Sequence, residues 1–414
     1  MNEAKRKFRL TSLERAWILY DVGNSAFVLL VATLIPIFFN ALAEGGGLSS
    51  VEYLAYWGYA ASAVTVITAV LSPILGTLAD TRNFKKPIFT FCVAVGVIGC
   101  CAMGMASTWL PFLLIFILAK VGFSGSLVFY DSMLSDVTVP DRMDEVSSKG
   151  YAWGYIGSCV PFVVCLALVL GAGSIGISQM TALNLALFIT AAWWLVTTLP
   201  LLRQYKQVHF VEVQEHAIRQ SFARIGHTLR HLKEDRQVFW FLLAFFCYID
   251  GVYTIIDMAT AYGTALGLDT TGLLLALLVT QIVAFPSALV FGRLSGQYPS
   301  GTLIPVCIAA YAGIALFAFF LKHQWQFWVL AVVVGMFQGG IQALSRSHFA
   351  KIIPPEKSGE YFGLFDICGK GASFLGTMIV SVGSQLTGSA NVGVGSLIVL
   401  FIVGFVLFRV SDRK

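Results

Sequence analysis

The residues in this sequence best suited to chemistry are charged side chains that lie inside long apolar stretches. They are Asp21, Lys120, Asp131, Asp250, Asp257, Asp366 and Lys370. A charge at the depth of a lipid bilayer costs about 2.5–3.5 kcal/mol on an insertion scale, so such a residue faces a partner or a water-filled cavity. Groups of this kind can bind a charged solute, carry a proton or join two helices.

Three of these charges lie near the middle of their segments, roughly 16–20 Å deep at a helical rise of about 1.5 Å per residue. They are Lys120, Asp250 and Lys370. Two cations and one anion predict that a carboxylate or phosphate of a solute binds between the lysines, while Asp250 holds an ammonium group or a coupling proton. The alternative is structural, because Asp366 and Lys370 have the i,i+4 spacing of a helical ion pair and Asp250 can pair with Lys120 across the bundle.

Neutral polar side chains accompany these charges. Tyr20 and Asn24 flank Asp21 on one turn of the first segment, and Gln338 and Gln342 have an i,i+4 spacing in the tenth. Hydrogen-bonding groups on several helices favour a solute site, although any one of them alone is better explained as a bridge between membrane helices. The predicted solute-binding residues are Tyr20, Asp21, Asn24, Lys120, Asp250, Gln338, Gln342 and Lys370, with Asp21 and Asp250 as the candidates for proton coupling.

The elements that position these residues are predicted to be membrane-spanning helices. The chain is 57% apolar and only 12% charged, whereas a soluble domain is about half apolar and a quarter charged. Its 414 residues allow about a dozen spans of ~20 residues. The predicted spans are 16–43, 52–80, 87–107, 109–136, 146–171, 179–202, 237–266, 271–295, 302–321, 325–350, 358–386 and 391–409.

The basic residues predict the orientation of these spans. Of the 27 lysines and arginines, Lys322 alone falls in a loop on the side opposite the N-terminus, and Lys120 and Lys370 lie inside spans. Since basic loops stay in the cytoplasm, both termini are predicted to be cytoplasmic. We therefore expect a multi-pass protein of the cell membrane, in contact with the lipid bilayer.

The chain is predicted to divide into a six-helix bundle (1–202), a linker (203–236) and a second six-helix bundle (237–414). The linker alternates basic and apolar residues, which is typical of an amphipathic helix on a membrane surface. The halves also repeat: the loop from Asp136 to Arg142 matches that from Lys351 to Lys357. Parallel repeats of this kind favour a transporter built from two related bundles.

Several classes of function do not fit this composition. The basic residues lie in short flanking loops, so a net charge of +5 does not predict nucleic-acid binding. All eight cysteines lie in apolar segments without a CxxC motif, which argues against disulfides and a metal site. The six histidines lie in the linker or near span ends and form no catalytic motif. We expect no enzyme activity, no cofactor and no metal.

The loop between the second and third spans carries the clearest motif. It reads Gly76-Thr-Leu-Ala-Asp80-Thr-Arg82-Asn-Phe-Lys85-Lys86 and resembles the signature loop of the major facilitator superfamily of secondary transporters. The resemblance implies that Asp80 latches the cytoplasmic ends of the two halves, near Ser358. The expected gating residues are Gly76, Asp80, Arg82, Asp131, Arg346 and Asp366. The second-half copy, Gly292 to Gln297, lacks the acidic residue, so the latch is expected to be one-sided.

Four further motifs narrow the resemblance to the vacuole-effluxer-like branch of the superfamily. They are Trp17 to Phe27, Tyr248 to Ile256, Gly339 to Ser347, and Phe365 to Lys370. This branch is associated with the export of amino acids from the fungal vacuole. The chain departs from it at Ile249, where an asparagine is more usual.

The sequence as a whole predicts an all-α membrane protein with twelve transmembrane helices in two pseudo-symmetric bundles, acting as a monomer. The predicted function is secondary transport of a small polar solute, an amino acid or a related zwitterion or organic anion, by alternating access and with proton coupling as a further hypothesis. The alternative is export of a drug or other amphiphile. Replacing Lys120 or Lys370 by alanine is expected to abolish uptake.

Overall fold

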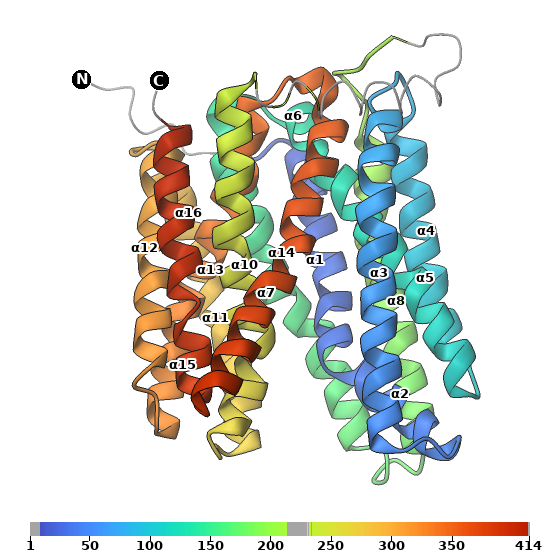
Figure 1. Cartoon of the computed structure of the whole chain (residues 1–414). Coiled ribbons are helices and arrows are strands. Elements are labelled where there is room, and N and C mark those ends of the chain that lie inside the picture. Colours follow the sequence, from blue (N-terminus) through green and yellow to red (C-terminus); the bar gives the residue numbers. More distant parts are fainter. Residues whose placement is uncertain (1–8, 213–229, 231, 233, 413–414) are drawn as a thin grey trace.

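The computed structural model describes residues 9–212, 230, 232 and 234–412 as an assembly of long helices (Figure 1). The first half contains α1 (Ser12–Ala32), α2 (Leu34–Gly45), α3 (Ser50–Ala79), α4 (Lys85–Met103), α5 (Trp109–Ser132), α6 (Leu134–Val137), α7 (Pro140–Leu170) and α8 (Gln179–Gln204). The second half contains α10 (Arg236–Ala265), α11 (Thr270–Leu294), α12 (Ser300–Ala318), α13 (Gln324–Ile352), η1 (Pro355–Lys357), α14 (Ser358–Thr387), α15 (Ala390–Gly395) and α16 (Ile398–Ser411).

The predicted fold class is confirmed. Among the described residues, eleven helical stretches are long and apolar enough to cross a membrane. The 30-residue helix α14 coincides with the remaining predicted span, and the side chains of residues 370–374 within it lie outside the described residues. The first and last predicted spans are each built from two helices, α1 with α2 and α15 with α16.

A proline explains the break in the first span. Pro36 lacks the backbone N–H that would bond to the carbonyl of Ala32, and its ring clashes with that carbonyl. The chain leaves helical geometry at Thr33, where φ is −129° and ψ is −73°. The Thr33 hydroxyl then donates to the carbonyl of Leu29 at 2.6 Å, which satisfies one of the exposed acceptors at the helix end.

The start of α1 is tied to α7 within the first half. Thr11 and Glu14 form a capping box, in which each side chain accepts a hydrogen bond from the backbone N–H of the other residue. The buried Glu14 carboxylate also accepts from Thr138 at 2.7 Å and from two guanidinium nitrogens of Arg142 at 2.8 and 2.7 Å. These contacts hold α1 and α7 together, and both helices carry residues of the site described below.

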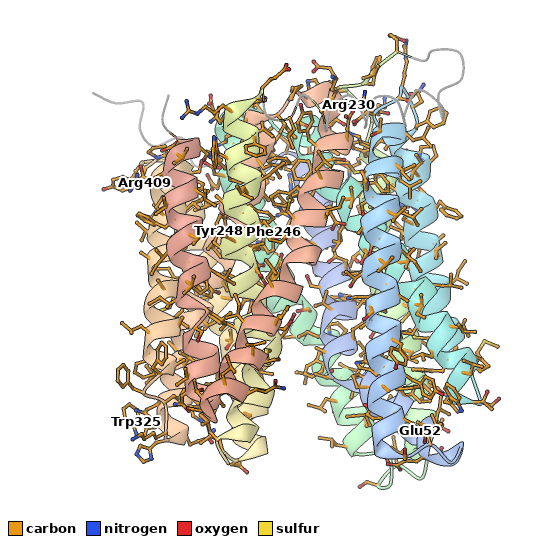
Figure 2. The ribbon with its side chains drawn as sticks, in the orientation of Figure 1. Glu52, Arg230, Phe246, Tyr248, Trp325 and Arg409 are labelled. Carbon is orange, nitrogen blue, oxygen red and sulfur yellow. The ribbon has the colours of Figure 1, made fainter. Side chains whose placement is uncertain are left out.

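α1 begins and α16 ends at the same end of the molecule, which is the upper end in Figure 1 and is called the termini face below. Figure 2 places Arg230 and Arg409 toward this face, and Glu52 and Trp325 at the opposite face. The predicted amphipathic linker helix falls largely on residues 213–229, which lie outside the described residues.

The two halves pack against each other through α3 and α14 on one side and through α7 against α11 and α13 on the other. Glycines allow the closest approach. A Cβ atom added to Gly363 of α14 would lie 2.7 Å from the Cα of Pro73 in α3, and Gly76 and Gly359 meet backbone to backbone in the same way. Larger side chains at these positions would push the halves apart, since a packed interface cannot absorb extra atoms without strain.

Candidate functional site between the two halves

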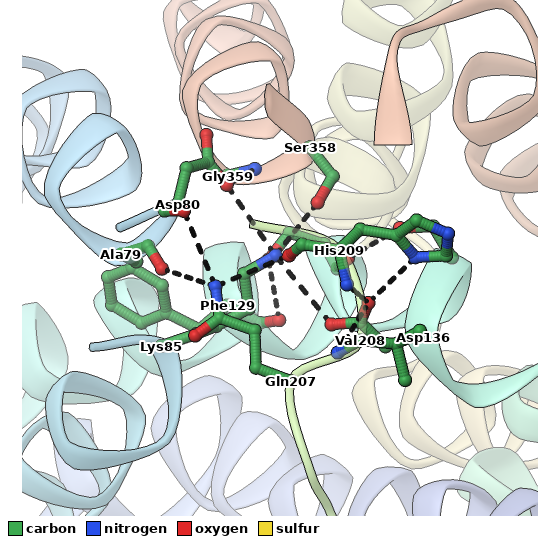
Figure 3. Close-up of polar contacts among 12 residues, drawn as sticks. Ala79, Asp80, Lys85, Phe129, Asp136, Gln207, Val208, His209, Ser358 and Gly359 are labelled. Carbon is green, nitrogen blue, oxygen red and sulfur yellow. Dashed lines mark hydrogen bonds and ion pairs between the residues drawn. The ribbon is translucent and has the colours of Figure 1, made fainter. Parts of the chain in front are cut away.

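The loop after α3 forms a buried polar contact with the start of α14 (Figure 3). Asp80 accepts hydrogen bonds from the backbone N–H groups of Gly359 at 2.7 Å and Glu360 at 2.8 Å. A carboxylate is favoured at this position because the first N–H groups of a helix have no partners within the helix and carry partial positive charge. The contact lies where the resemblance placed it, and it joins the first half to the second.

Lys85 supports this contact from the beginning of α4. Its ammonium group lies 3.5 Å from Asp80 and 4.0 Å from Asp136, and it donates to the hydroxyl of Ser358 at 2.8 Å. The side chains of Lys85, Asp80 and Asp136 are all 0% exposed. The cation therefore offsets two carboxylates that would otherwise be costly to bury.

Asp136 also holds the first residues that follow α8. It accepts hydrogen bonds from the Tyr205 hydroxyl at 2.5 Å and from the backbone N–H of His209 at 2.9 Å. Burial, and then the charge of Asp136, raises the pKa of Tyr205, so its phenol keeps the proton that it donates. Gln207 donates to the carbonyl of Ala79 at 3.0 Å, directly before Asp80. The chain that leaves the first half is thus packed onto the contact in Figure 3.

Arg82 was expected to contribute to gating, but in this conformation its side chain makes no ion pair or hydrogen bond with the described residues of the second half. Its side chain is about half exposed, lies 3.5 Å from the exposed carboxylate of Glu212 and covers the ring of Phe210 at 5.0 Å. These partners come from the segment after α8 and not from the second half. An exposed ion pair of this kind contributes little, about 0–1 kcal/mol.

A second contact between the halves is centred on Arg346 of α13. Its guanidinium group is 2% exposed and lies 3.0 Å from a carboxylate oxygen of Asp131 and 3.7 Å from one of Asp21. It also donates to the hydroxyl of Ser147 at 2.9 Å and to the carbonyl of the same residue at 3.0 Å. An arginine at such a site provides a positive charge, as a lysine would, and also a planar set of donors, which a lysine lacks.

Aromatic rings complete the surroundings of this guanidinium. Its central carbon lies 4.6 Å from the ring centre of Trp17, 5.3 Å from that of Tyr130 and 4.3 Å from that of Tyr151. Cations are attracted to ring faces at such distances. We call the first-half residues around the guanidinium the Arg346 cage: Trp17, Asp21, Tyr130, Asp131, Ser147 and Tyr151.

The structure separates Asp21 from the two polar neighbours that were expected to bind solute with it. Asp21 faces Arg346 in the cage, where it accepts a hydrogen bond from the Tyr130 hydroxyl at 3.1 Å. Tyr20 is instead buried inside the first half and donates to Ser126 at 2.6 Å. Asn24 is also buried and donates to the carbonyl of Tyr20 at 3.1 Å. In this conformation these two side chains contribute to helix packing.

Further polar contacts join the halves beside these two centres. Asp366 accepts from the Ser72 hydroxyl of α3 at 2.8 Å. Gln342 accepts from the Tyr155 hydroxyl of α7 at 3.0 Å, so this predicted solute-binding residue lies in the contact between α7 and α13. Together with the contacts of Asp80 and Arg346, these bonds link the halves on the side of the termini face.

Opposite charges from the two halves lie near the middle of the molecule, a relation that the sequence reasoning missed. Lys120 of α5 interacts electrostatically with Asp257 of α10, which comes from the other half. By the helical rise, Lys120 lies about 16 Å along α5 from Trp109, and Asp257 lies about 12 Å along α10 from Ala265. The two helix ends are both at the opposite face, so the charges have similar depths. The pairing of Lys120 with Asp250 stays a prediction.

Asp250 lies on α10 about two helical turns farther from the opposite face than Asp257 does. One carboxylate oxygen accepts from the backbone N–H of Gly376 in α14 at 2.9 Å and from the Thr254 hydroxyl at 3.3 Å. Its other oxygen is buried without a hydrogen-bond partner among the described residues. The expected solute-binding side chain of Lys370 lies outside the described residues, so its pairing with Asp366 or with a solute stays a prediction.

Gln338 lines a pocket inside the second half. Most of the lining is apolar, from α10, α11, α13, α14, α15 and Leu397, and the polar groups include Thr254, Thr280 and Gln281. The side-chain oxygen of Gln338 is buried and has no hydrogen-bond partner among the described residues. The lining therefore matches the chemistry of a small apolar group that carries a hydrogen-bond donor.

Solved structures of other proteins share this fold. The human organic anion transporter MFSD10 superposes with a TM-score of 0.72 at 13% identity, covering 96% of this chain and 98% of that one. The major facilitator superfamily transporter FucP, in its outward conformation, superposes with a TM-score of 0.73 at 16% identity, covering 97% and 98%. The fold is therefore that of a major facilitator superfamily transporter, and the chain is a multi-pass membrane protein.

Sequence comparisons narrow this class to a family. The model of the family described as vacuole effluxer Atg22 like matches residues 12–138 and 135–414, so the chain belongs to that family. A Bacillus subtilis protein described as an uncharacterized MFS-type transporter, YxiO, is 42% identical over 96% of this chain and 94% of its own length. Autophagy-related protein 22 of Coccidioides immitis is 24% identical over 83% of this chain and 70% of its own length. The chain is a transporter and not an enzyme.

Proposed function

We propose that this transporter moves an amino acid or a related zwitterion or organic anion across the cell membrane by alternating access. The observation that carries the choice of solute is the position of two opposite charges, Lys120 on α5 and Asp257 on α10, at similar depths in the two halves. Each half supplies one charge at a similar depth, so the carboxylate and ammonium groups of a zwitterion can replace the two partners. Such a replacement keeps every charge paired, which is required in a space of low dielectric constant.

The direction of opening follows from the contacts of Asp80 and Arg346, which join the halves on the termini face. The excess of basic residues on that side supports a cytoplasmic location for both termini. The described conformation is then closed to the cytoplasm and faces outward. Rocking of one half against the other around the midplane would expose the solute site to the cytoplasm.

Asp250 is our candidate for coupling transport to protons, with Asp21 as the second. The support is the buried Asp250 oxygen without a hydrogen-bond partner among the described residues. Burying a charged carboxylate without a cation is costly, whereas a protonated one is tolerated. Uptake into proteoliposomes that is equal with and without a pH gradient would contradict this role.

The test of the solute site is uptake of radiolabelled amino acids and organic acids by proteoliposomes that contain the purified protein. Lys120→Ala and Asp257→Asn should each reduce uptake of a zwitterion at least tenfold, because each leaves one charge of the bound solute without a partner. Lys322→Ala is the matched control, since Lys322 is an exposed lysine in the loop between α12 and α13. Normal uptake by either site variant would refute the proposed solute site.

Export of an amphiphile is the second candidate, and the pocket beside Gln338 is the observation that favours it. An amphiphile would fill this apolar space without requiring Lys120. Gln338→Leu should then abolish transport of the amphiphile, while Lys120→Ala should leave it unchanged. The opposite pattern would support the zwitterion.

A further inference from the structure

The walls of the Arg346 cage are held in place by contacts inside the first half. Trp17 stacks on Tyr130 with ring centres 4.3 Å apart and donates its indole N–H to the Tyr130 carbonyl at 2.9 Å. The Tyr130 hydroxyl donates in turn to Asp21 at 3.1 Å. None of these three contacts involves Arg346. The cage is therefore preformed and does not need its cation in order to keep its shape.

The cation in the cage belongs to the other half. Arg346 lies on α13, whereas Trp17 and Asp21 lie on α1, Tyr130 and Asp131 on α5, and Ser147 and Tyr151 on α7. Any movement that separates α13 from α1 and α7 withdraws the guanidinium from the cage. The two carboxylates and three aromatic rings would then face the opening without the positive charge that they surround now.

We propose that, in the state open at the termini face, the cage binds an organic cation, the ammonium or guanidinium group of a small molecule. Arg346 displaces this cation when the halves close, so it acts as a tethered competitor. The proposal rests on the alternating access proposed above. It adds a cation site on the cytoplasmic side, separate from the Lys120–Asp257 pair.

The chemistry of the cage favours an organic cation over a metal ion. Ring faces attract large, weakly hydrated cations at the distances seen for Arg346. Asp131 and Ser147 now accept hydrogen bonds from the guanidinium of Arg346 at 3.0 and 2.9 Å. The planar guanidinium of a small molecule can donate to them in the same geometry. The part of the chain that the structure describes contains no group of three or more His, Cys, Asp or Glu residues arranged to hold a metal ion.

The cage itself is tested by binding of ethylguanidinium to the purified full-length Arg346→Ala protein, followed by the quenching of tryptophan fluorescence. With the tethered competitor removed, the probe should bind at least tenfold more tightly than to the unchanged protein. Adding Asp131→Asn or Tyr151→Leu should weaken this binding about tenfold, while Asp141→Asn, an exposed carboxylate of the same face, should not. Equal binding by all of these proteins, or an equal response to NaCl, would overturn the proposal.

The second measurement leaves Arg346 in place, so it does not depend on the folding of an arginine variant. Ser148 is buried against Gly292 of α11, and its hydroxyl has no hydrogen-bond partner among the described residues, so Ser148→Cys is a mild reporter of opening between the halves. Ethylguanidinium should increase alkylation at position 148 severalfold, measured by peptide mass spectrometry. An alkylation rate at position 148 that is the same with and without ethylguanidinium would overturn the proposed cation site. If position 148 is never alkylated, even in the Asp80→Asn variant, alternating access would be overturned instead. The two failures can be told apart because the binding of ethylguanidinium is measured separately by fluorescence.

Discussion

Replacing Asp80 by asparagine should shift the protein toward the state that is open at the termini face. Asparagine keeps one carbonyl oxygen, so it can still accept from the N–H of Gly359, now at 2.7 Å. Its amide nitrogen would face the N–H of Glu360, now 2.8 Å from the second carboxylate oxygen, and cannot accept from it. The variant also loses the negative charge at the start of α14.

The size of the shift follows from the contacts that exist only when the halves are closed. A hydrogen bond to a charged group contributes about 1.5–3 kcal/mol, and a charge at a helix N-terminus about 0.3–1 kcal/mol. The ion pair with Lys85 lies within the first half and is kept in both states, so it does not count. A loss of about 2–3 kcal/mol corresponds to roughly a 30- to 150-fold change in the ratio of open to closed molecules.

The assay measures the rate at which the cysteine of the Ser148→Cys protein is alkylated. This rate is compared between proteins with and without the additional Asp80→Asn change. Labelling should become faster by an amount that approaches this ratio while the open state is rare. Asp141→Asn is the control, because Asp141 is exposed in the first turn of α7. Equal labelling rates for Asp80→Asn and the control would show that Asp80 does not stabilise the closed state.

Two further changes test the same interface. Gly359→Ala places a methyl group against the backbone of Gly76 and should also speed labelling at position 148, whereas Gly313→Ala, which has open space around it, should not. Equal rates in both alanine variants would contradict the close-approach argument. Lys85→Met leaves two carboxylates buried without their cation and should lower the free energy of unfolding by about 3–5 kcal/mol. Lys86→Met, at a half-buried neighbour, should change thermal stability little in the same detergent, and an equal loss in both would refute the ion-pair argument.

The sequence by itself determined the fold class, and its resemblance to a known family indicated the place of the Asp80 contact. Hydropathy is a local property, so a window of about 20 residues is enough to find each span. Asp80 could be placed at the start of α14 because its loop carries a recognisable motif and because carboxylates are favoured at helix N-termini. The breaks in the first and last spans were harder to predict from the sequence, although Pro36 is a signal for the first break.

Only the tertiary structure decided which charges meet. Asp250 and Asp257 are seven residues apart on α10, so they lie on nearly the same face of the helix and the periodicity cannot separate them. Their depths relative to α5 depend on where each helix begins, and this relation places Asp257 with Lys120 and leaves Asp250 against α14. The partners of Arg346 were hidden for the same reason, since its cage combines three helices of the other half. Contacts between distant segments depend on helix rotation and depth, which a linear pattern of residue types does not specify.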